Sequence, residues 1–81
     1  MPVELICNNS IIEEFIDRFG EKCYMKPYDE NTFIAKVDVA VTEGLVSWIM
    51  QFGDKVRVRG PKELKNMIID KTNSILAMYN R

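Results

Sequence analysis

Along the chain, apolar residues recur either at every second position, as in a strand, or every three to four positions, as in a helix. The points where one period changes to the other predict the ends of the secondary-structure elements. Residues 2–7 follow a period of two, which is typical of a strand. One side of this run is apolar and consists of Val3, Leu5 and Cys7. The other side carries Glu4 and Ile6. The pattern therefore predicts a first strand whose apolar side faces a core.

A helical period follows the turn at Asn8 and Asn9. Ser10 and Glu13 have the S-x-x-E spacing of a capping box, which predicts that a helix begins at Ser10. Large apolar residues then recur on one stripe, at Ile11, Ile12, Phe15, Ile16 and Phe19. Gly20 can adopt the left-handed conformation that ends a helix, so we predict a core-facing amphipathic helix up to this residue.

Two further strands are predicted at residues 23–28 and 32–41, separated by the turn-forming residues 29–31. Pro27 lacks an N–H group, which places the second strand at an edge of a sheet. The third strand alternates regularly, with Phe33, Ala35, Val37, Val39 and Val41 on one side. The two strands should form a hairpin.

The next helix is predicted from Thr42, as N-cap, to a stop at Gly53. Its buried face is Leu45, Trp48, Ile49 and Phe52. Because Trp48 shares this helical spacing, we interpret it as a core residue rather than a platform for stacking a ligand. A short strand at 55–59 follows, and Pro61 then favours the start of a helix.

The last predicted helix, from Lys62 to about Tyr79, has two apolar sides. One side is Leu64, Met67, Ile68, Ile75, Met78 and Tyr79, and Ile69 and Leu76 lie off it. A domain this small cannot cover both sides, and exposed apolar patches usually mark partner interfaces. Ile69 and Leu76 are therefore candidate interface residues, for self-association or for docking to a neighbouring domain.

The element order is strand, helix, strand, strand, helix, strand, helix, in one domain over residues 1–81. It predicts an α+β fold, the ferredoxin-like split βαβ plan (βαββαβ) with an added C-terminal helix. Right-handed crossovers place both internal helices on one face of the antiparallel sheet, with the first and third strands central. Cys7 and Cys23 would then lie a strand apart, which disfavours a disulfide.

The other face of the sheet collects cations. If the valines of the fourth strand face the core, then Lys55, Arg57 and Arg59 face away from it, together with Lys36 and, less clearly, Lys26. One interpretation is an anion site for phosphate, a nucleotide or an oligonucleotide, with arginine providing bidentate donors. The other is that charges on an edge strand prevent edge-to-edge pairing. The sequence leaves both open.

Composition narrows the function classes. The chain is 47% hydrophobic and 28% charged with a net charge of -1, which suits a folded domain and gives no general affinity for a nucleic-acid duplex. An RNA-recognition domain needs a run of stacking aromatics that residues 32–41 lack, leaving only Tyr24 and Tyr28 as weak candidates. With no histidine, no glycine-rich phosphate loop and no G-x-S-x-G motif, we expect no catalysis, metal or cofactor. No run reaches the length of a membrane span and no signal peptide is evident, so a cytoplasmic location is expected.

The second half of the chain has the series L-x-x-W-I-x-x-F-G-D-x-V-x-V-x-x-P-x-x-L. It is carried by Leu45, Trp48, Ile49, Phe52, Gly53, Asp54, Val56, Val58, Pro61 and Leu64. This series resembles the C-terminal extension, or WCX domain, of bacterial WYL-domain transcriptional regulators. The resemblance implies a regulatory module that contributes to dimerisation and to sensing of an effector, including a nucleic-acid or nucleotide effector, beside a WYL domain.

The same resemblance implies that the chain is the C-terminal fragment of a larger regulator, since a strand pattern starts directly after Met1. Specific DNA binding would then depend on an N-terminal helix-turn-helix domain. Partners are expected to be a second copy of the chain, the adjacent WYL domain, or both. A stand-alone ACT-like domain, which binds small molecules on the same split βαβ plan, is the alternative. Upstream helix-turn-helix and WYL segments would distinguish the two.

Overall fold

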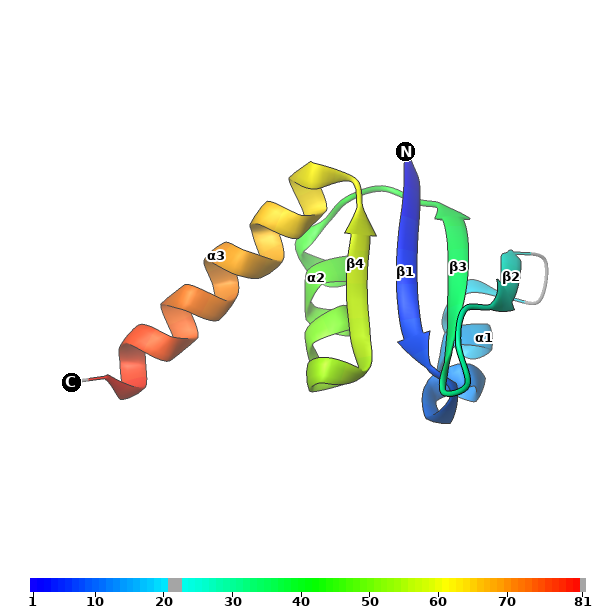
Figure 1. The fold of residues 1–81 in the computed structure, drawn as a ribbon. Coiled ribbons are helices and arrows are strands. Elements are labelled where there is room, and N and C mark those ends of the chain that lie inside the picture. The colour runs from blue at the N-terminus through cyan, green and yellow to red at the C-terminus, as the bar shows by residue number, and fades with distance from the viewer. Residues whose placement is uncertain (21–22, 81) are drawn as a thin grey trace.

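A four-stranded antiparallel sheet forms the centre of the structure, a computed structural model that describes residues 1–20 and 23–80 (Figure 1). The strands lie in the order β2-β3-β1-β4. Their bounds are β1 Pro2–Asn8, β2 Tyr24–Pro27, β3 Thr32–Asp38 and β4 Val56–Gly60. The prediction that the first and third strands are central, with the Pro27 strand at an edge, is confirmed.

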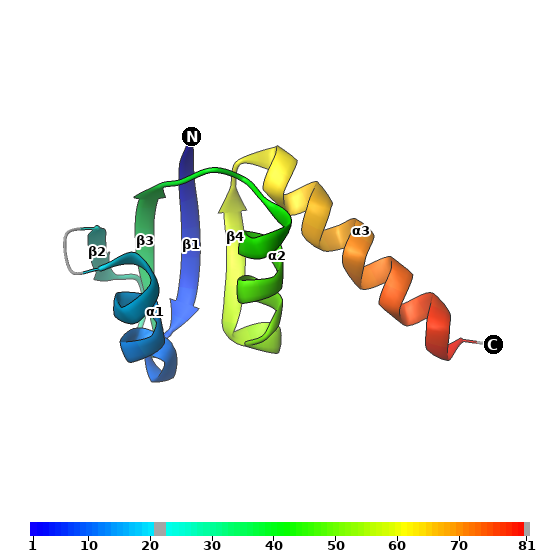
Figure 2. The ribbon, with the colours of Figure 1, turned by 180° about the vertical axis from the view of Figure 1, so that it is seen from behind.

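Two helices, α1 (Ile12–Phe19) and α2 (Glu43–Met50), cover one face of this sheet (Figure 2). The third, α3 (Lys62–Tyr79), extends away from the β4 edge (Figure 1). This is the predicted α+β, ferredoxin-like split βαβ arrangement with an added C-terminal helix. Among the described residues, no helix covers the face of the sheet opposite α1 and α2 (Figure 1).

The core lies between the sheet and its two helices. It includes Val3, Leu5, Cys7, Phe15, Phe33, Val37, Leu45, Ile49, Val56, Val58 and Leu64. The strand residues in this set are those that the period-two patterns assigned to the inner side. Trp48 is half-buried and packs against this core, with ring centroids 5.1 Å from Phe19 and 4.9 Å from Phe52. The interpretation of Trp48 as a packing residue is confirmed.

The predicted capping box at Ser10 is wrong. A short 3-10 turn, Asn9–Ile11, precedes α1, and the backbone N–H of Ser10 donates to Oδ1 of Asn8 at 2.9 Å. An asparagine side chain at a strand end readily accepts from the backbone two residues on, and this local turn takes the place of the Ser10 cap. The N-cap of α1 is Ile11, which makes no side-chain hydrogen bond.

Several predicted boundaries shift by one to three residues. β2 is shorter than residues 23–28, and β3 ends at Asp38 rather than Val41, because its register with β1 runs only from Asn8↔Thr32 to Pro2↔Asp38. Lys55 belongs to a 3-10 turn, Gly53–Lys55, rather than to β4. Thr42 caps α2 as predicted, since its Oγ1 accepts from the N–H of Leu45 at 3.1 Å.

Only the N-terminal part of α3 joins the core. Leu64 is fully buried and Met67 and Ile68 are half-buried, whereas residues 71–80 are all exposed. The apolar side predicted for this helix therefore packs on the domain only in its first two turns. Within residues 1–20 and 23–80, no helix is both long and apolar enough to cross a membrane.

Candidate effector-binding face

The open face of the sheet has an apolar floor and a charged rim. Ile6 and Ile34, paired across β1 and β3, alternate away from the core yet are only 6% and 4% exposed. The side chains around Ile34 include the longer polar ones of Lys26, Lys36 and Arg59. The sequence assigned both isoleucines to the outer side correctly, but gave no sign that they would be buried there.

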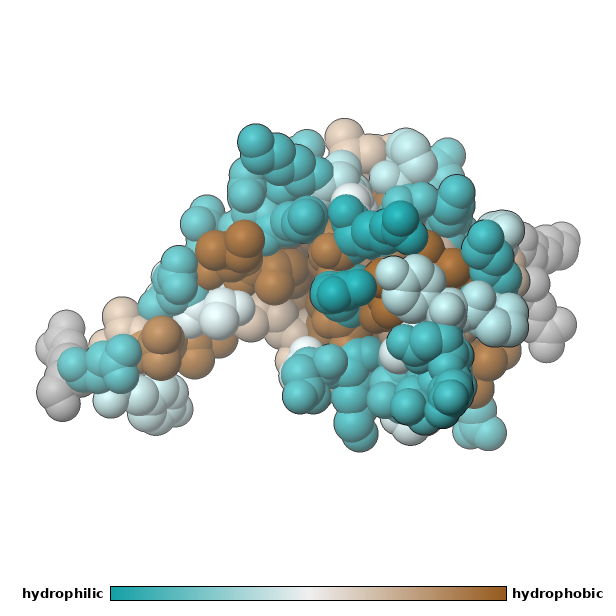
Figure 3. Space-filling model, in the orientation of Figure 1, coloured by the Kyte–Doolittle hydropathy of each residue, from teal (hydrophilic) through white to brown (hydrophobic). Residues whose placement is uncertain are grey.

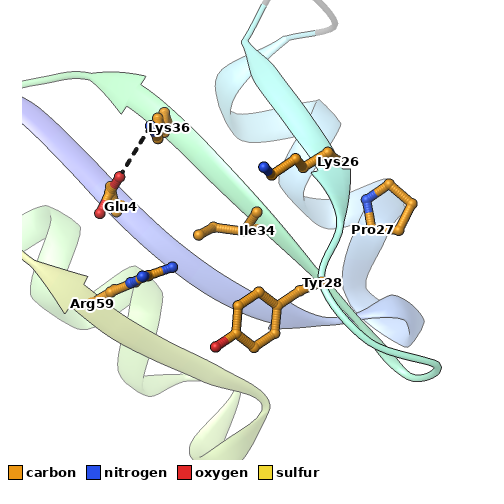
Figure 4. A pocket seen from close by; sticks show the side chains of 7 residues that line it. All are labelled: Glu4, Lys26, Pro27, Tyr28, Ile34, Lys36 and Arg59. Carbon is orange, nitrogen blue, oxygen red and sulfur yellow. Dashed lines mark ion pairs between the residues drawn. The ribbon is translucent and has the colours of Figure 1, made fainter.

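A hollow of about 410 Å³ lies on this face (Figure 4). It is lined by Glu4, Lys26, Pro27, Tyr28, Ile34, Lys36 and Arg59. Arg59 from β4 and Lys26 from β2 extend toward each other from opposite edges of the sheet, above Ile34 (Figure 4). Of the predicted cations, Lys36 and Arg59 share this hollow, together with Lys26, which the sequence indicated less clearly.

Two aromatic rings and one carboxylate lie beside two of these cations, Lys36 and Arg59. Nζ of Lys36 lies 3.3 Å from Oε1 of Glu4 and 5.7 Å from the ring centroid of Tyr24. Cζ of Arg59 lies 6.0 Å from the ring centroid of Tyr28, a cation–π contact that spans the open face. The hollow thus has three cations, Lys26, Lys36 and Arg59, against the single carboxylate of Glu4, which favours an anionic ligand.

Lys55 and Arg57, the other predicted cations, line a separate hollow of about 280 Å³. Its remaining lining residues are Ile6, Asn8, Tyr28, Asp29, Thr32 and Asp54. Two carboxylates therefore balance two cations, and this hollow has no excess of positive charge. The four cations predicted to form one site are divided between two neighbouring hollows, with Tyr28 lining both.

Asp29 is held as a carboxylate in the turn between β2 and β3. Its Oδ1 accepts from the backbone N–H of Asn31 and from Oγ1 of Thr32, both at 2.8 Å. These hydrogen bonds, the one from Asn31 first, lower the pKa of Asp29 below its ordinary value of 3.8. The negative charge beside Lys55 and Arg57 is therefore permanent at neutral pH.

Sequence reasoning missed Glu4 and Ile34 as site residues and weighed Tyr28 only as a weak stacking candidate. Glu4 and Ile34 could have been found from alternation alone, because they occupy outward positions on the two central strands. Tyr28 follows the end of β2, where no period predicts its direction. Its place beside Arg59 depends on the width of the sheet, which the sequence does not give.

The two candidate interface residues on α3 are exposed, Ile69 by 52% and Leu76 by 53%. Ile69 also lines a mainly apolar hollow of about 340 Å³ between β4 and α3. The other lining residues are Asp54, Val56, Arg57, Val58, Lys65 and Ile68. Hydrophobic surface along α3 is visible in the space-filling view (Figure 3).

The remaining reactive groups lie away from these hollows. Cys7 and Cys23 are both free, and burial raises the pKa of the Cys7 thiol to about 12. Across the part of the chain that the structure describes, no three histidine, cysteine, aspartate or glutamate residues are grouped so that they could hold a metal ion.

Comparison with protein-family models identifies the family to which the chain belongs. The family model described as the WCX domain matches residues 3–76, which is nearly the whole chain. The chain therefore belongs to the WCX domain family, as its resemblance at residues 45–64 predicted. No curated protein matches the sequence.

Proposed function

We propose that this WCX domain is a non-catalytic regulatory module of a helix-turn-helix/WYL transcriptional regulator, contributing to dimerisation and to effector sensing. The observation that carries the sensing role is the cationic hollow on the open face of a chain that belongs to the WCX family. In such a regulator the domain works in the cytoplasm, and sequence-specific contacts to DNA come from the separate helix-turn-helix domain.

The chemistry of the hollow favours a nucleotide or a single-stranded nucleic acid as effector. Arg59 and Lys26 supply donors for phosphate oxygens. Tyr28, which lines the hollow, and Tyr24, which lies beside Lys36, are each 47% exposed and offer rings on which a base can stack, and Ile34 provides an apolar floor in the hollow. This mode of binding reads shape and charge rather than base sequence.

A titration with a short labelled oligothymidylate tests the proposal. Arg59→Ala removes a charged donor from the hollow, which is worth about 1.5–3 kcal/mol and predicts at least a tenfold weaker affinity. Arg18→Ala serves as the matched control, because Arg18 is exposed on α1, behind the sheet. Equal affinities for Arg59→Ala and the unaltered chain would remove the anion site.

An ACT-like small-molecule sensor remains the second candidate, and Glu4 is the observation that favours it. A carboxylate beside cations suits a zwitterionic ligand such as an amino acid, and a volume of about 410 Å³ is within the range of small-molecule sites. Calorimetric titration with the standard amino acids distinguishes the two. Binding of an amino acid that is lost in Glu4→Gln supports the sensor, and binding of the oligonucleotide alone supports the regulator.

A further inference from the structure

The C-terminal half of α3 exposes apolar side chains that nothing in the described chain covers. Residues 71–80 are all exposed, and the large apolar residues of α3 that stand in solvent are Ile69, Ile75, Leu76, Met78 and Tyr79. The exposed part of α3, residues 71–79, is shorter than the about 12–15 residues below which an isolated helix is marginal in water. Of the exposed apolar residues, Ile69 and Leu76 share one side of the helix, and Ile75, Met78 and Tyr79 belong to its other apolar side. The side with Ile69 and Leu76 is the one that continues into the apolar hollow between β4 and α3.

We propose that α3 pairs antiparallel with α3 of a second copy of this chain, so that Leu76 of each protomer enters the β4–α3 hollow of the other. The inference rests on the proposed dimerisation and names the surface responsible for it. The mainly apolar hollow beside Ile69 is the receiving site, and the exposed Leu76 is the side chain that fills it.

The spacing along α3 makes this arrangement self-complementary. Ile69 and Leu76 are separated by seven residues, which is about two helical turns, so both lie on the same side of α3 as the hollow. A twofold axis between Thr72 and Asn73 places Ile69 opposite Leu76 of the partner subunit, and repeats the contact symmetrically. An isologous interface requires that one surface carry both halves of the contact, and α3 does so.

The charges along α3 favour the antiparallel orientation and a second copy. The first turns carry Lys62 and Lys65, whereas the last turn carries no basic residue. Antiparallel pairing therefore brings these lysines beside the partner's helix C-terminus, where cations offset the negative end of the helix dipole. Lys65 already lines the receiving hollow. A parallel arrangement would instead bring the lysines of both copies together.

The available area is that of a weak dimer. Taking about 200 Å² for each large side chain, the exposed fractions of Ile69 and Leu76 amount to roughly 200 Å² per protomer, to which the lining of the β4–α3 hollow adds. A standard interface buries about 800 Å² per partner, including a polar rim. The Ile69 and Leu76 side of α3 therefore provides a small apolar centre, and the dimer should dissociate on dilution.

Sedimentation velocity at several concentrations of the 81-residue chain tests the inference. The unaltered chain should dimerise, and Ile69→Glu and Leu76→Glu should each weaken the dimer at least tenfold, because each places a charge in an apolar contact. Both positions are exposed in the monomer, so folding, followed by circular dichroism, should be unchanged. Ser74→Glu is the matched control, since Ser74 is exposed and lies two residues before Leu76, hence on nearly the opposite side of α3.

Cysteine cross-linking tests the register in a Cys23→Ser background, which leaves only the buried Cys7. Thr72→Cys, next to the proposed axis, should form an intermolecular disulfide on mild oxidation, and Ser74→Cys should not. A dimer unaffected by both glutamate substitutions, or cross-linking at Ser74 instead of Thr72, would overturn the α3 interface while leaving dimerisation in place. A monomer at every concentration would overturn the interface and the proposed dimerisation together.

Discussion

Leu64 and Leu76 offer a matched pair of substitutions within one helix. Leu64 is fully buried against the sheet and α2, and Leu76 is 53% exposed, although both are leucines in α3. Truncation of a fully buried leucine to alanine costs about 2–5 kcal/mol, because transfer free energy is lost and a cavity remains. The same change at an exposed site should stay within about 0.5 kcal/mol.

The difference between the two losses of stability is large compared with the total free energy of unfolding of the domain. A chain of 81 residues should be stable by about 4–12 kcal/mol, so Leu64→Ala removes a substantial part of it. At about 4–8 °C per kcal/mol, Leu64→Ala should lower Tm by at least about 8 °C. Leu76→Ala should leave Tm nearly unchanged, provided that the protein is dilute enough to be monomeric.

Urea unfolding followed by Trp48 fluorescence measures both free energies, since Trp48 packs against the core. Repeating the Leu76→Ala measurement at high protein concentration adds an internal check, because a residue in a dimer contact should become costly to truncate there. Equal losses of stability for the two variants in dilute solution would refute the account of α3, in which only its first turns are anchored.

Three other predictions follow from local contacts. Glu4→Gln removes the carboxylate that lies 3.3 Å from Nζ of Lys36, and should strengthen oligothymidylate binding about threefold to fivefold. The reason is that an ion pair at this distance in water is worth about 1 kcal/mol. Weaker binding of the variant in the titration would contradict this prediction. Cys23 should react with a thiol reagent at pH 8 in the folded protein, whereas Cys7 should react only in denaturant. The pKa of Cys7, about 12, keeps its thiol protonated at pH 8. Equal reaction rates of the two thiols in a timed assay would count against the burial of Cys7. Asp29 should stabilise the β2–β3 turn above pH 3.8, and this stabilisation should be lost as the pH falls through the lower pKa that Asp29 has in the folded protein. An NMR titration of Asp29 with a midpoint at or above 3.8 would show that the hydrogen bonds to its carboxylate are absent.

The fold was largely predictable because the chain alternates its two periods clearly. Strand sides, the edge position of the Pro27 strand and the Thr42 cap all follow from local rules, and the structure confirms them. The capping box at Ser10 was wrong because Asn8 offered an equally local alternative. Such choices between neighbouring turn-forming side chains depend on the exact path of the chain after the strand.

The candidate face was predicted less completely. Alternation showed which cations point away from the core, but only the pairing of β1 with β3 and β4 determines which of them meet. Lys36 and Arg59 line one hollow with Ile34, whereas Lys55 and Arg57 line another with Asp29 and Asp54. Burial of an isoleucine on an open face also depends on long side chains from three strands, which a single-strand pattern cannot reveal.

The role of the open face in effector binding is tested most directly by mapping amide chemical shifts during titration of the domain with a short oligothymidylate. The account predicts that the largest shifts fall on residues around the hollow, such as Ile34, Lys36 and Arg59, and that they disappear in Arg59→Ala. Residues of α1 and α2, behind the sheet, should be unaffected (Figure 2). No shifts at all, or shifts confined to those helices, would contradict it.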